Sequence, residues 1–324
     1  MAGTLADLAV MSSDEYERGV IERFKLTSDF IRLLPQKTIK GTTYKYRVEE
    51  VAPGVSWRDV NVGYPESTGV IAPRIESTMI VGGDVFLDNA LLKNGRSGGD
   101  SLDLKAEQYD MKARSLAREL ERAYFEGDDL VNPSEMPGLR RRLTGNQVIQ
   151  AAAGAPAALT AGMMDSLIDA VDRSIGTPHI FMNKSNARRL TNQVNTIGGS
   201  VVINWDSVND SGPIIQRYYG VPIHVVEDGW DASSLLGFDE DPGNGTANTS
   251  SIYVVIFDEQ MGVCGLISGG DGDPLVSVRE VGETTASGAG NPPGIVGRIE
   301  TYPGLMIKSP RAAARLRNVQ FSAA

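Results

Sequence analysis

The chain has 324 residues, with 31 Lys or Arg against 41 Asp or Glu and a formal charge of −10. This acidic balance argues against a dedicated nucleic-acid reader, which needs a basic face. One cysteine excludes an internal disulfide and a CxxC motif, two histidines exclude a histidine-rich metal site, and no apolar run reaches the roughly 18 residues of a membrane span. We expect no cofactor.

Residues 1–36 have the pattern of an N-terminal arm. Ser12 and Glu15 fit a capping box, in which each side chain satisfies an amide of the first helical turn. Apolar residues then follow at helical spacing from Tyr16 to Phe24, and Pro35 ends the segment. The apolar stripe is narrow, so we expect the arm to lie on another surface.

From Gly41 onwards the pattern predicts an extended hairpin. Tyr44, Tyr46 and Val48 alternate with charged residues, which is typical of a strand, and a returning strand is predicted over 78–87. Between them, about 51–76 is rich in Gly and Pro. A lone two-stranded hairpin is marginal in water, so we expect a second subunit to hold this projection.

The most regular helix is predicted over 101–126. Its apolar residues, from Leu102 to Ala123, recur every three or four positions, and Gly127 can end it. At 1.5 Å per residue such a helix is roughly 39 Å long.

Further helices are predicted over 161–174 and 185–194, and the rest predicts short aliphatic strands between loops rich in Gly, Asn and Asp. The fold class is α+β. The predicted strands are 180–182, 201–203, 221–226, 252–257, 263–267, 275–281 and 305–307.

This order of segments resembles the major capsid proteins of tailed bacteriophages (Caudoviricetes), which have the HK97-type fold. Five stretches carry the resemblance, each degenerate alone but placed in the family's order. They are ARELERAYFEGDD (117–129), HIFMNKSNARRL (179–190), YGVPIHVVED (219–228), YVVIFDEQMGVCGLISG (253–269) and RIETYPGLMIKSPRAAARL (298–316).

The resemblance implies a division into four parts. They would be an N-terminal arm (1–36), an extended E-loop (37–97), a P-domain around spine helix 101–126 (98–175 plus 296–324), and an A-domain with a mixed central sheet (176–295).

The resemblance also implies a structural function. The chain would self-assemble into the pentamers and hexamers of an icosahedral phage head, the virion capsid, built in the host bacterial cytoplasm around a double-stranded DNA genome without sequence-specific binding. Partners would be other copies, a portal protein and a decoration protein, with no membrane. An encapsulin-type nanocompartment shell is an alternative, because encapsulins share this fold.

Two departures from the family lead to expectations. No Lys occurs between Lys45 and Lys93, so the hairpin tip lacks the nucleophile for an isopeptide crosslink, and we expect a non-covalent shell. The arm is short and begins at Met1, so we expect scaffolding from a separate protein.

Candidate intersubunit contacts are Trp57, Arg58 and Tyr64 in the hairpin tip, because Trp, Tyr and Arg dominate interface energetics; packing within the loop is the alternative. The run Arg140, Arg141 and Arg142 either bridges a neighbour's carboxylates or DNA, or is ion-paired within the chain. Arg74, Asp239 and Asp241 complete the candidate contacts.

An acidic loop over 227–241 is the basis of a third option, a metal-dependent enzyme. Clustered carboxylates suit calcium, but EF-hand spacing is absent, and we favour a solvated loop facing the capsomer axis. No GxSxG or other catalytic motif occurs, so we expect no enzyme. His224 is expected in the core and Cys264 as a buried, inert thiol.

Overall fold

The computed structural model describes residues 27–91, 104–152, 155–197, 203–207, 214–226, 234–269, 276–283 and 293–321. The helix predicted after Ser12 and the acidic residues at 227, 228 and 231 lie outside them. Helix and strand mix along the described chain, which confirms the α+β class. Among the described helices, none has the length and apolarity to cross a membrane.

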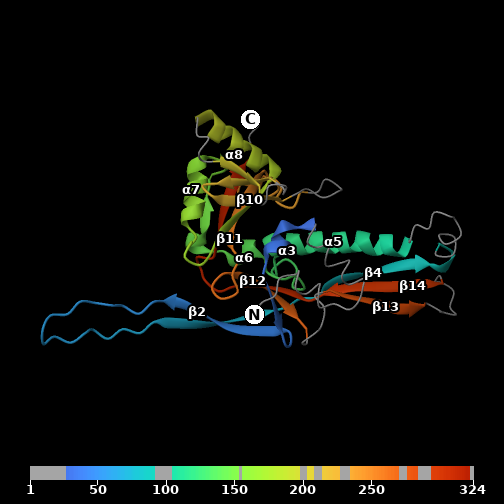
Figure 1. Cartoon of the computed structure of the whole chain (residues 1–324), viewed down its shortest axis with the longest axis horizontal. Coiled ribbons are helices and arrows are strands. Elements are labelled where there is room, and N and C mark those ends of the chain that lie inside the picture. The colour runs from blue at the N-terminus through green and yellow to red at the C-terminus, as the bar shows by residue number, and fades with distance from the viewer. Residues whose placement is uncertain are drawn as a thin grey trace.

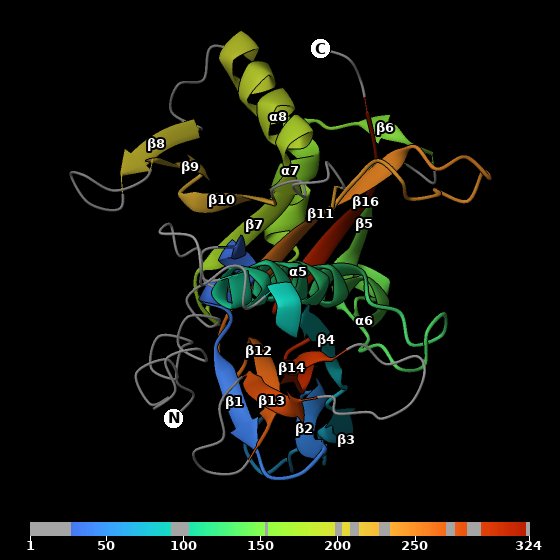
Figure 2. The same ribbon diagram turned by 90° about the vertical axis from the view of Figure 1, so that its right-hand side faces the viewer.

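The largest layer is an eight-stranded sheet, in the order β5-β16-β11-β7-β10-β9-β8 with β6 beside β16. Helices α7 (Ala161–Asp169) and α8 (Lys184–Ile197) accompany it (Figure 2). Its central strand β11 is buried at every position. The strands are β5 (Val148–Gln150), β6 (Ala157–Ala158), β7 (Pro178–Asn183), β8 (Ile203–Ser207), β9 (Ile214–Tyr218), β10 (Val221–Val226), β11 (Thr249–Ile256) and β16 (Ala313–Gln320).

Three small sheets lie on the opposite side of helix α5 (Leu104–Glu126) from this layer (Figure 2). One has the order β1-β12-β15, one has β13-β14-β4, and one is the β2-β3 pair. The strands are β1 (Gln36–Ile39), β2 (Thr43–Val51), β3 (Val70–Ser77), β4 (Val81–Asp88), β12 (Val263–Ser268), β13 (Ser277–Glu283), β14 (Gly294–Thr301) and β15 (Pro303–Ile307).

Helix α5 organises the main core. Its predicted stripe is buried at Tyr109, Ala113 and Leu116, and its last turn packs Phe125 against Phe30 of the short helix α3 (Asp29–Leu33) with the ring centroids 4.8 Å apart. The helix ends at Glu126, and the next position is Gly127, where any side chain would collide with the carbonyl oxygens of Ala123 and Met136. The predicted spine helix is therefore confirmed from Leu104 onwards, residues 101–103 being outside the description.

One strand prediction is wrong. The strand that returns along β2 is β3, residues 70–77, whereas most of the predicted returning strand 78–87 is β4, which pairs with β14. Both segments carry aliphatic residues, but in β3 they face solvent: Val70, Ile71 and Ile75 are exposed. β4 pairs with β14, which is distant in the sequence, and the alternation of residues within one strand does not reveal such a partner.

The C-terminal segment contributes to three sheets. β14 lies between β13 and β4, β15 pairs with β12, and β16 runs between β11 and β5 in the large sheet. The sequence did not predict a strand at β16, although Ala314 and Leu316 are fully buried there. Charged Arg315 and Arg317 interrupt its apolar pattern.

Candidate assembly surface

A long hairpin protrudes from the body (Figure 1). β2 and β3 pair antiparallel from Thr43–Ser77 to Val51–Val70, and residues 52–69 connect them as the tip. Within the described chain neither strand pairs with a third strand, so both outer edges are open. A two-stranded ribbon of this kind has little stability alone, and its base must be fastened.

The root of the hairpin is fastened by Glu76 of β3. Its carboxylate accepts two hydrogen bonds from Arg142, at 2.5 and 2.7 Å. The Tyr46 hydroxyl lies 3.0 Å from the same carboxylate and 3.2 Å from the carbonyl oxygen of Ile307. Burial, and then the charge of Glu76, raise the pKa of Tyr46. The arginine and glutamate side chains are only 13% and 12% exposed, so this is a partly desolvated fork-to-fork pair.

The Arg142 pair joins the hairpin to helix α6 (Leu139–Arg142), because Arg142 is the last residue of that helix. Its guanidinium also donates to the carbonyl oxygen of Pro137 at 2.7 Å. A cavity of about 710 Å³ lies beside the junction, lined by hairpin residues and by the segment after α6. Neither Glu76 nor Tyr46 is among the sequence candidates for contacts. Glu76 and Arg142 are 66 residues apart, and nothing in the sequence around either residue indicates that they pair.

The hairpin tip presents apolar side chains to solvent. Trp57 and Val55 are essentially fully exposed, at 102% and 98%, and Val60 is 80% exposed. Arg58 and Tyr64 instead pack on each other, with the guanidinium carbon 5.2 Å from the ring centroid. Of the three tip candidates, two therefore have a local partner, and Trp57 has its whole surface available for another molecule.

The other predicted contact residues lie at separate places. Arg74 is on the hairpin, 3.6 Å from Glu50 in an exposed pair. Arg141 pairs with Asp129 at 3.3 Å and Asp128 at 3.8 Å, so together with Arg142 two members of the arginine run are ion-paired within the chain. Arg140 is exposed.

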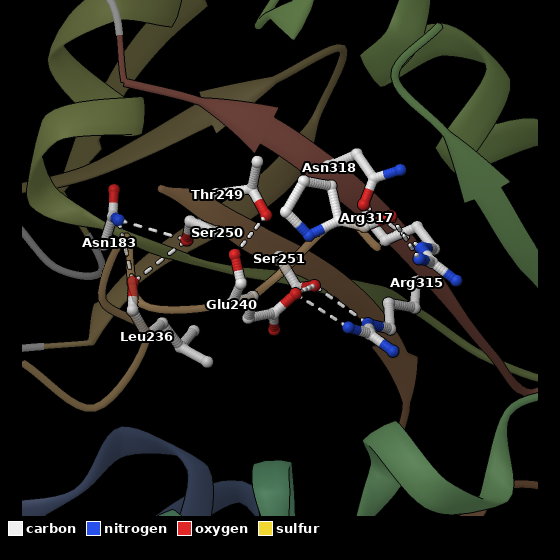
Figure 3. Close-up of polar contacts among 10 residues, drawn as sticks. Asn183, Leu236, Glu240, Thr249, Ser250, Ser251, Arg315, Arg317 and Asn318 are labelled. Carbon is white, nitrogen blue, oxygen red and sulfur yellow. Dashed lines mark hydrogen bonds and ion pairs between the residues drawn. The ribbon is translucent and has the colours of Figure 1, made fainter. Parts of the chain in front are cut away.

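The described end of the acidic loop is anchored to the large sheet (Figure 3). Glu240 is buried and binds Arg315 of β16 at 2.8 Å and the Ser251 hydroxyl at 2.7 Å. Asp241 accepts backbone N–H bonds from Gly243, Asn244 and Gly245, which lower its pKa. Asp239 is exposed.

Beside Glu240, the loop carbonyl of Leu236 accepts hydrogen bonds from Asn183 at 2.8 Å and Ser250 at 3.0 Å (Figure 3). The described part of the chain contains no group of three or more His, Cys, Asp or Glu side chains arranged to hold a metal ion. The anchoring role of Glu240 was missed because the sequence showed it only as one of several adjacent acids.

His224 and Cys264 are buried, and His179 is half-buried. His224 is 4% exposed; its Nδ1 lies 3.1 Å from Asp29 and its Nε2 lies 3.0 Å from His179. Burial, and then His224, lower the pKa of His179 to about 4. Cys264 is fully buried, and burial raises its pKa to about 12. The predictions of a core histidine and a buried thiol are confirmed.

Comparison with solved structures identifies related folds. The SrpI encapsulin of Synechococcus elongatus aligns with a TM-score of 0.61 at 18% identity, covering 93% of this chain and 92% of that one. The capsid of a native GTA particle aligns at 0.59 and 17% identity, covering 92% and 91%. A structure from Microbacterium phage Oxtober96 aligns at 0.60 and 13% identity, covering 90% of each chain. No family model and no curated protein matches the sequence. These similarities confirm the fold expected from the sequence.

Proposed function

Starting from the HK97-like capsid fold of this chain, which phage capsids and encapsulin shells share, we propose that the protein is the major capsid protein of a tailed bacteriophage. Copies self-assemble into the pentamers and hexamers of an icosahedral head, and the head encloses the double-stranded DNA genome. The function is structural and requires no catalytic step.

The protruding hairpin is the observation that carries this proposal. It places a row of exposed apolar side chains beyond the body of its own chain, with Trp57 and Val55 almost fully solvated. Fully burying one large apolar side chain contributes roughly 1.5–3 kcal/mol. A projection with an apolar tip and a fastened root suits contact with a second copy.

The assembly mechanism follows from this geometry. Head-to-tail contacts between identical subunits form a closed ring when the rotation from one subunit to the next adds up to a full turn. The hairpin of one copy then lies over a neighbour. We assign residues 37–97 to the E-loop segment, in which residues 43–77 form the protruding hairpin, 98–175 plus 296–324 to the P-domain and 176–295 to the A-domain. Many modest contacts are repeated around a closed shell, and together they stabilise it through multivalency.

The alternative is an encapsulin-type shell that encloses a protein cargo. It is favoured by one observation, the alignment with the SrpI encapsulin, whose TM-score of 0.61 matches the 0.60 of the phage structure. The two functions differ in what the shell encloses.

The experiment is to express the full chain and size it by light scattering and negative-stain electron microscopy. Closed shells or capsomer-sized rings are expected, and nuclease-protected DNA inside them would favour the phage head over the nanocompartment. A stable monomer near 35 kDa, both alone and with its virion partners, would contradict the shell function. Scaffolding, portal and decoration partners, and assembly in the host cytoplasm, remain predictions.

A further inference from the structure

A second cavity, of about 230 Å³, lies where the C-terminal end of α5, helix α6, the loop after Asp239 and strand β16 meet. This is far more than the roughly 10–15 Å³ that one ordered water needs. Its lining contains four arginines, four carboxylates and Asn318. Whether such a cavity takes an anion or a cation depends on which of these groups already have partners.

Three of the four carboxylates are satisfied within the chain. Glu240 is bound by Arg315 and Ser251. Asp241 accepts three backbone N–H bonds from its own loop. Asp128 accepts the backbone N–H of Leu130 at 2.9 Å and lies 3.8 Å from Arg141.

The fourth carboxyl group, Glu126, is half-buried at the end of α5. Burial is the largest cause that raises its pKa to about 7, and the nearby charges of Asp239 and Glu240 add to it. Arg140 and Arg122 act in the opposite direction. Around neutral pH this group therefore exchanges a proton, and in its protonated form it is a hydrogen-bond donor.

Several donors remain available, in contrast to the satisfied acceptors. Within the described part of the chain, neither Arg140 nor Arg317 has a carboxylate within ion-pair distance. The Arg317 guanidinium donates to the Asn318 amide oxygen, at 3.2 Å, and to the Pro242 carbonyl oxygen, at 3.5 Å. Asn318 lines the cavity, is 2% exposed, and its amide nitrogen has no hydrogen-bond partner. A buried donor without a partner is rare in folded proteins and calls for an explanation.

A bulge in β16 gathers these donors. Leu316 pairs with Ile252 but Val319 pairs with Ser250, so three steps along β16 match two along β11. Asn318 absorbs the extra residue in the left-handed region, with φ of 64°. Bulges re-aim side chains. Arg317 lies next to Asn318, whereas Arg315 reaches to Glu240 and Ser251 (Figure 3).

We propose that this cavity binds a small oxyanion of the phosphate class, held by the guanidinium groups of Arg140 and Arg317 and by the amide of Asn318. A guanidinium fork matches the geometry of a phosphate, and charge-assisted hydrogen bonds are the strong ones. A cation is disfavoured because three of the four carboxylates are already committed.

Binding is coupled to protonation of Glu126. A bound anion next to this carboxyl group favours its neutral, donating form. The complex therefore takes up a proton, and affinity rises as the pH falls, by up to about tenfold per unit above pH 7.

The test is calorimetric titration of the full chain with inorganic phosphate at pH 6, and with sulfate, whose charge does not change over this range, at pH 6 and pH 8. Tighter sulfate binding at pH 6 is expected, and Arg317→Gln should weaken the binding of both ions at least tenfold. The matched control is Arg311→Gln, because Arg311 is an exposed arginine outside this cavity. Asn318→Gly keeps the left-handed backbone accessible and removes only the amide, so it should also weaken binding.

The variant Glu126→Gln isolates the coupling: it should keep binding both ions and lose the difference in sulfate affinity between pH 6 and pH 8. Competition with a DNA duplex distinguishes a nucleic-acid phosphate from the free ion, and either result is oxyanion binding. Absence of phosphate binding at millimolar concentration, equal affinities for Arg317→Gln and Arg311→Gln, or calcium binding in place of phosphate would overturn the proposal. None of these outcomes depends on shell assembly.

Discussion

Replacing Glu76 by Gln should release the root of the hairpin. Arg142 would lose its charged partner while remaining only 13% exposed, and Tyr46 would lose a charged acceptor. Removing one partner of a buried ion pair costs about 3 kcal/mol. With an unfolding entropy of about 2.1 cal/mol/K per residue, a chain of 324 residues would melt about 4 °C lower.

The same change should affect assembly more than the fold of the body. If a neighbouring copy binds the hairpin in its fastened orientation, a loss of about 3 kcal/mol per hairpin raises the protein concentration needed for assembly by up to about 140-fold. Particle yield against concentration, measured by light scattering, reports this threshold. Thermal unfolding measured on the same samples reports the stability of the chain.

The control is Arg74→Gln on the same strand. Its pair with Glu50 spans 3.6 Å and is 57% and 44% exposed, and exposed pairs contribute between zero and about 1 kcal/mol. Glu76→Gln should therefore lower the thermal stability of the chain more than Arg74→Gln does. Equal losses of stability in the two variants would refute the role of a fastened root.

Three further predictions concern buried groups and the shell. Burial raises the pKa of Glu121 from 4.5 to about 7, so the proton that stabilises the folded chain is fully bound below pH 4.5 and is lost as the pH rises through 7. Glu121→Gln should therefore raise the free energy of unfolding by up to about 3 kcal/mol at pH 8 and leave it unchanged at pH 4.5, as measured by denaturant unfolding. Native Cys264 should resist thiol reagents at pH 8 and react after unfolding, because its thiol is fully buried; rapid labelling of the folded chain would contradict this. Denatured shells should run as a single band near 35 kDa, whereas a ladder would disprove the non-covalent shell.

The sequence predicted those helices and strands whose buried residues recur at regular spacing within the element itself. Helix α5 and strands β7, β10, β11 and β12 each bury a face that the residue pattern already shows. It did not predict which strands pair. β3 is mostly exposed, so its pattern gives no core face, and β4 was assigned to the hairpin although its buried residues Val85 and Leu87 face β14 and α5.

The sequence singled out one member of each charged pair, Arg142 and Glu240, but not the partner of either. Arg142 and Glu76 are 66 positions apart, and Arg315 and Glu240 are 75 apart. A single sequence shows that each charge exists, and only the folded sheet shows which charges meet. The arginine run illustrates the limit: Arg141 and Arg142 are bound within the chain, whereas Arg140 lines the small cavity.

Two residues of the hairpin distinguish the stability of a single chain from the binding between chains. The Trp57 side chain gains nothing from its own body because it is fully exposed, so truncating it should leave the unfolding of the single chain unchanged. Glu76 is buried against its own body, so truncating it must weaken the single chain as well. A shell subunit predicts assembly losses from both changes and a stability loss from Glu76 alone. A protein whose hairpin had no partner would show the stability loss without any assembly loss.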